Sequence, residues 1–217
     1  MVYRPLGFTR PLKQLDASQI TRRLISNSRI AMAARIVDTI KTDHREIVDY
    51  YSEVLNSTSN KEKVQWQNQF TWELARHSIA EELVVYPQLE KKLADGRAMA
   101  EKDRNEHQTV KEQLKEFQNM KPSDPDLDAK DLYQHIKEEG SQDLSKLEDA
   151  ITEEESKHLT KSFGRTKMFV PSRSHPSAPD KPPFETGVGL MTAPIHQLAD
   201  LFRKGPHTSG MPNPSTK

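Results

Sequence analysis

Histidines and glutamates interrupt the apolar faces of four successive helix-forming segments of this chain. In the first segment Ile40, Ile47 and Val54 recur with the three- and four-residue steps of an amphipathic helix, and His44 takes the place of a core residue between them. The other three segments repeat the pattern with His77 and Glu81, with His107, and with His135 and Glu139. The sequence therefore predicts an all-α fold, an antiparallel up-down four-helix bundle with polar groups in its core.

A buried carboxylate needs a compensating positive charge. An unpaired ionised group costs several kcal/mol in an apolar core, and here two glutamates face four imidazoles. Counting about 1.5 Å of rise per residue from each predicted turn, the six groups fall in one layer to within roughly 6–8 Å, which tilted helices and long side chains can span. The arrangement predicts a metal site.

The spacing of the ligands indicates the kind of metal. His77 and Glu81, and again His135 and Glu139, are four residues apart, so that each pair lies on one helix face. Imidazole together with carboxylate suits iron, manganese or zinc, and carboxylates that bridge two ions suit a dinuclear site. The remaining histidines, His158, His175, His196 and His207, lie beyond the fourth segment and are expected to be solvated.

Composition excludes several classes of function. The 217 residues include 32 basic and 32 acidic ones, so net charge gives no reason to expect a nucleic-acid partner. There is no cysteine, which excludes disulfides, thiolate metal sites and cysteine nucleophiles. No apolar run approaches the length of a membrane span, and no membrane partner is expected.

The chain divides into three predicted parts: a basic leader at 1–32, the bundle at 33–169 and a Pro-rich tail at 170–217. Residues 1–37 hold six arginines and a single acidic residue, which is the profile of a mitochondrial presequence. The alternative is a disordered basic leader, or an extension of the first helix, on a cytoplasmic protein. Nine of the 14 prolines lie in the tail, which should be extended except for a short helix near 194–204.

Local signals mark the ends of the predicted helices. Asn60 is the expected N-cap of the second helix, and Pro87 should kink or end that helix just past its metal motif. Gly96 separates the second helix from the third, and 121–126 separates the third from the fourth. The run from Thr152 to Glu155 predicts a capping box that begins a further helix reaching Phe169.

The same residues resemble a known family. A His in the first helix, His-x-x-x-Glu in the second, His in the third and His-x-x-x-Glu in the fourth look like the hemerythrin/HHE cation-binding domain over roughly 36–160. The segment 163–179 is similar to extensions of fungal members. The resemblance implies two bridged iron ions, held by the following residues: His44, His77, Glu81, His107, His135 and Glu139. It also implies a protein that binds or senses dioxygen, another small diatomic ligand, or iron, rather than an enzyme.

One departure from the family concerns the third helix. Oxygen-carrying members have His-x-x-x-His there, whereas Lys111 follows His107 at that spacing. This removes one nitrogen ligand and favours sensing or slow oxidative chemistry over reversible oxygen carriage. Lys111 and Tyr51 are candidates for groups that support the ligands.

Two other functions compete with this one. A ferritin-like di-iron oxidase would need Glu-x-x-His twice on inward faces, and the chain offers only Glu155 with His158. A metal-free helical scaffold with a partner-binding tail would have to accommodate two buried carboxylates without a cation.

Overall fold

The computed structural model describes residues 35–124, 136, 141–171, 173–174 and 176–177. All secondary structure in these ranges is helical, which confirms the predicted all-α class. The whole predicted leader and most of the predicted tail, including the short helix near 194–204, lie outside the described residues. The same holds for five of the histidines and glutamates discussed above: His135, Glu139, His175, His196 and His207.

The first two predicted helices are α2 (Ile36–Asn56) and α3 (Asn60–Ala80), which pack against each other along their lengths. The N-cap of α3 differs from the prediction by one residue. Ser59 accepts a hydrogen bond from the backbone N–H of Glu62, and Asn60 is the first helical residue. A serine hydroxyl at this place satisfies one of the free N–H groups at the helix start.

A single turn of π-helix follows α3 at Glu81–Val85, and α4 (Tyr86–Lys92) continues from it. Pro87 therefore does not end the helix: the chain stays helical from Asn60 to Lys92, and the distortion takes the form of the π turn. A proline inside a helix donates no N–H and its ring crowds the carbonyl four residues earlier. A wider turn just before it relieves that conflict.

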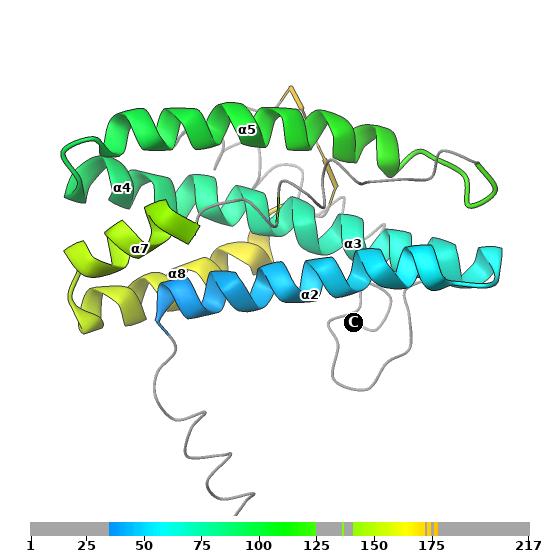
Figure 1. Ribbon diagram of the computed structural model, residues 1–217, viewed down its shortest axis with the longest axis horizontal. Coiled ribbons are helices and arrows are strands. Elements are labelled where there is room, and N and C mark those ends of the chain that lie inside the picture. Colours follow the sequence, from blue (N-terminus) through cyan, green and yellow to red (C-terminus); the bar gives the residue numbers. More distant parts are fainter. Residues whose placement is uncertain (1–34, 125–135, 137–140, 172, 175, 178–217) are drawn as a thin grey trace, which may run out of the picture. The chain divides into compact units, whose positions relative to one another are not determined.

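The helix α5 (Gly96–Phe117) returns alongside α4 and α3 after a short turn. Figure 1 shows α3, η1 and α4 as one run, with α5 on one side and α2 with α8 on the other. Gly96 is the first residue of α5, and a Cβ there would lie 1.8 Å from the carbonyl oxygen of Leu89. Only glycine permits this close approach.

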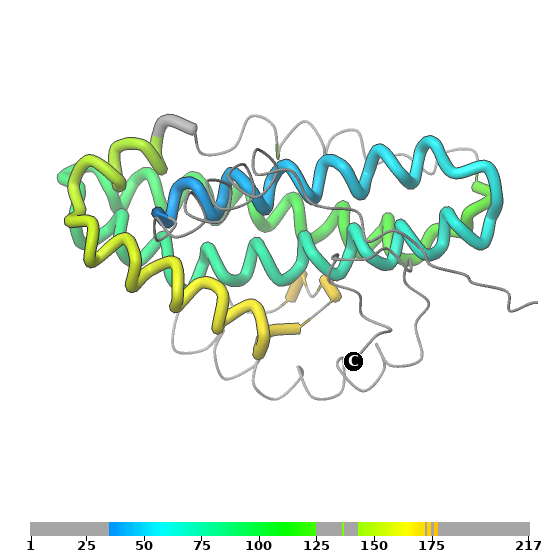
Figure 2. Tube along the Cα trace, turned by 90° about the horizontal axis from the view of Figure 1, so that it is seen from below, coloured from blue at the N-terminus to red at the C-terminus, as the bar shows by residue number. Residues whose placement is uncertain are grey.

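Two further helices complete the described part of the bundle. Of the predicted fourth helix, the structure describes Ile136, which is helical and buried, and α7 (Ser141–Ala150). The helix α8 (Glu153–Phe169) packs on α2, α3 and η1 (Figure 2). It begins at the predicted capping box, in which Thr152 and Glu155 bond to each other's backbone.

The core of the described residues consists of two apolar clusters. One joins the start of α2, the end of α3 and the start of α5 to α4, α7 and α8, and includes Ile40, Ala80 and Ala100. The other joins the second half of α2 to α3 and α5, and includes Ile47, Leu74 and Val110. On α2, α3 and α5 the candidate histidine lies, along the helix, between a residue of the first cluster and one of the second. His44 lies between Ile40 and Ile47. In the same way His77 lies between Ala80 and Leu74, and His107 between Ala100 and Val110. The candidate site is thus a polar layer between two apolar ones.

Candidate metal centre

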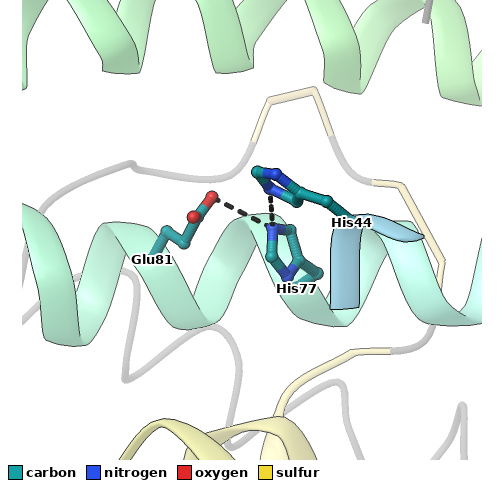
Figure 3. A group of neighbouring side chains, drawn as sticks. All are labelled: His44, His77 and Glu81. Atoms are coloured by element: carbon teal, nitrogen blue, oxygen red, sulfur yellow. Dashed lines mark hydrogen bonds and ion pairs between the residues drawn. The ribbon is translucent and has the colours of Figure 1, made fainter. Parts of the chain in front are cut away.

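Three of the predicted ligands form a compact group. The Nε2 atoms of His44 and His77 are 2.9 Å apart, and Nε2 of His77 is 3.4 Å from Oε2 of Glu81 (Figure 3). One donor atom from each of the three lies within 4.8 Å of the other two. His77 and Glu81 are buried and His44 is half-buried.

A fourth predicted ligand approaches the same carboxylate from another helix. His107 on α5 is 1 % exposed, and its Nε2 lies 3.4 Å from Oε2 of Glu81. That oxygen is therefore equally far from His77 and His107. Both separations exceed an ordinary N–H···O hydrogen bond, and this buried oxygen accepts none from the described residues.

These separations fit a metal centre. First-row ions bind imidazole nitrogen and carboxylate oxygen at about 2.0–2.2 Å, which places neighbouring donor atoms about 3.0–3.4 Å apart around the ion. The donor atoms here are 2.9 Å and 3.4 Å apart. A buried carboxylate oxygen without a hydrogen bond, facing two ring nitrogens at such distances, is suited to binding a cation.

Each buried histidine is oriented by a carboxylate behind it. Nδ1 of His77 lies 3.2 Å from Oδ2 of Asp43, and Nδ1 of His107 lies 3.2 Å from Oε1 of Glu82. Donation from Nδ1–H to a carboxylate directs the lone pair of Nε2 toward the centre of the layer, the orientation that metal-binding histidines usually require. Both Nε2 atoms face Glu81, so the orientation favours the shared oxygen.

The orienting carboxylates are themselves paired with lysines. Nζ of Lys111 lies 2.7 Å from the second oxygen of Glu82, and all of these groups are buried. Lys167 of α8 forms ion pairs with Asp43 and with Glu73. Lys111 thus faces the interior and acts on His107 through Glu82.

The charges of the metal-free site depend on these pairs. Burial opposes the charged form of His77, but the carboxylates of Glu81 and Asp43 outweigh it and raise the pKa of His77 to about 10. Burial would also raise the pKa of Glu81, yet the positive charge of His77 and His107 holds that pKa well below its usual range. In the metal-free site a proton on His77 therefore compensates the negative charge of Glu81. A bound cation could replace that proton.

Several residues of this layer escape prediction from periodicity alone. Asp43 precedes His44 by one residue and Glu82 follows Glu81 by one, so neither lies on the regular stripe of inward-facing positions. Tyr86 lies five residues after Glu81, and its hydroxyl oxygen is 2.9 Å from Nε2 and 3.3 Å from Nδ1 of His107. Of the two supporting residues predicted from the sequence, Lys111 pairs with Glu82 as described above. Tyr51 packs against Phe70 in the apolar cluster, with ring centroids 5.7 Å apart.

Comparison with known proteins agrees with this geometry. The family model described as the hemerythrin HHE cation-binding domain matches residues 35–156. An uncharacterized hemerythrin-like protein of Schizosaccharomyces pombe is 51% identical over 179 residues, which cover 79% of this chain and 88% of the relative. No solved structure matches the chain.

The fold and the His–Glu layer define a helical cation-binding domain. The chain belongs to the hemerythrin HHE family. None of the described helices is long and apolar enough to cross a membrane.

Proposed function

We propose that this protein is a non-haem di-iron protein that binds or senses dioxygen or iron. The observation that supports it is the position of Glu81, whose Oε2 lies 3.4 Å from Nε2 of both His77 and His107. A carboxylate that lies between histidines from two helices can bridge two ions, one held by each histidine.

The remaining ligands come from both described and undescribed parts of the chain. His44 completes a pair with His77, since their Nε2 atoms are 2.9 Å apart. His135 and Glu139 would supply the other half from the fourth helix, with Glu139 as a second bridge. Iron bound there would supply an open coordination position for a small diatomic ligand. The protein orients Nε2 of His77 and His107 and keeps bulk water away from them.

The ferritin-like oxidase is not favoured. Its one sequence match, Glu155 with His158, does not lie in the polar layer. Glu155 forms the capping box of α8 and an ion pair with Lys92, and His158 is exposed.

The ligand assignment can be tested by metal analysis of protein purified from iron-fed cells. His77→Ala and Glu81→Ala should each lose most of the iron, because each removes a donor at the centre of the layer. His158→Ala is the matched control and should keep the wild-type content. Wild-type iron in both site variants, or loss in the control alone, would contradict the assignment.

A second measurement separates a binding protein from an oxidase. The optical spectrum of reduced, iron-loaded protein should change when dioxygen is added. Sustained oxygen consumption with an added reductant should not follow. Multiple turnovers would instead support the oxidase.

A further inference from the structure

The π turn changes which residues share a face with Glu81. In an α-helix the fifth residue onward is rotated by about 140°. At Glu81–Val85 the chain takes an extra residue into the turn, and the backbone N–H of Tyr86 bonds to the carbonyl oxygen of Glu81. Tyr86 is thereby brought back toward the face of Glu81, and π turns of this kind occur often at functional sites.

The hydroxyl of Tyr86 reaches His107, one of the predicted ligands. Its oxygen is 2.9 Å from Nε2 and 3.3 Å from Nδ1 of that ring, and the same Nε2 faces Glu81 at 3.4 Å. The two separations measured from Nε2 are close to those between neighbouring donors of one first-row ion. Tyr86 is 3 % exposed, and the Arg104 guanidinium lies 5.7 Å from its ring centroid, within cation–π range, which fixes the ring in place.

The position of Tyr86 also compensates for a ligand that α5 lacks. Lys111 occupies the place at which a second histidine would follow His107 on α5, and its Nζ is paired with Glu82. The half of the site around His107 therefore gains no nitrogen from residue 111. A phenolate oxygen is a hard, anionic donor, which suits iron in its oxidised state.

Building on the proposed function, we infer that Tyr86 is an additional iron ligand on the His107 side of the centre. The phenol binds as phenolate and gives its proton to water. No bond to carbon and no electron transfer is involved. Tyr86 then supplies the donor that Lys111 does not.

Bound phenolate gives iron(III) a charge-transfer band in the visible and characteristic ring modes in the resonance Raman spectrum. The oxidised, iron-loaded wild-type protein should show both. Tyr86→Phe, which preserves the ring, should abolish both while most of the iron is retained. Tyr50→Phe is the matched control, a buried tyrosine in the apolar cluster of α2, α3 and α5, and should leave the spectrum unchanged.

A further variant decides the question if Tyr86→Phe fails to fold or to hold iron. With Tyr3, Tyr50, Tyr51 and Tyr133 all changed to Phe, the band and ring modes should persist, since only Tyr86 remains. Their loss from that iron-loaded variant would overturn the inference. Wild-type protein that binds two irons without phenolate modes would overturn it too and leave the proposed function intact. Wild-type protein that binds no iron would refute both.

Discussion

At the scale of single residues, the polar layer depends on the pairing of every buried charge. Glu82 is fully buried, with one oxygen near His107 and the other on Lys111. Removing one partner of such a pair leaves an uncompensated charge in a medium that solvates it poorly. Lys111 is therefore expected to matter for stability as well as for the site.

Lys111→Met tests this expectation. It should lower the free energy of unfolding of the metal-free protein by about 3 kcal/mol, since Glu82 loses its cation. Lys102→Met is the control on the same helix: its Nζ lies 3.0 Å from Glu106, but the side chain is 65% exposed. Its loss should cost less than about 0.5 kcal/mol. Equal losses of unfolding free energy in urea would show that the buried Lys111–Glu82 pair contributes no more to stability than the exposed Lys102–Glu106 pair.

At the scale of helices, the start of α5 depends on glycine. The Cβ of an alanine at residue 96 would meet the backbone carbonyl of Leu89 at 1.8 Å, and backbone cannot rotate aside as a side chain can. This contact sets how closely α5 approaches α4, and hence how His107 is placed opposite Glu81.

Gly96→Ala should therefore destabilise the protein by about 2 kcal/mol or more. Gly164→Ala provides the contrast, because nothing lies within 4 Å of a Cβ at that exposed position in α8. It should stabilise by about 0.5–1 kcal/mol through helix propensity. Thermal unfolding of the two variants gives the comparison, and a neutral Gly96→Ala would mean that α4 and α5 can separate without cost.

Regular periodicity predicted the regular elements of this fold well. The three- and four-residue steps gave the all-helical class, and the Thr152–Glu155 spacing gave the start of α8. They also indicated that His44, His77, Glu81 and His107 would converge, as the structure places them. Tyr86 could not be found in this way, because only the π turn puts a residue five positions on beside Glu81. Lys167 was equally hidden, since its partners Asp43 and Glu73 belong to other helices.

At the scale of the whole molecule, the described bundle separates two apolar clusters by one charged layer. Such a layer weakens a core unless its charges are balanced. Lys111 of α5 balances Glu82, and Lys167 of α8 balances Glu73. In the metal-free protein a proton on His77 balances Glu81. The one buried carboxylate oxygen of this layer without a hydrogen bond from the described residues is Oε2 of Glu81, at its centre.

The central claim is that this carboxylate joins two ions, and a stoichiometric titration tests it most directly. Metal-free protein is titrated with Fe²⁺ under anaerobic conditions while bound iron is measured at each step. The account predicts a break at two irons per chain in the wild type, and at one or none in Glu81→Ala. A break at one iron per chain in the wild type, unchanged in Glu81→Ala, would contradict it.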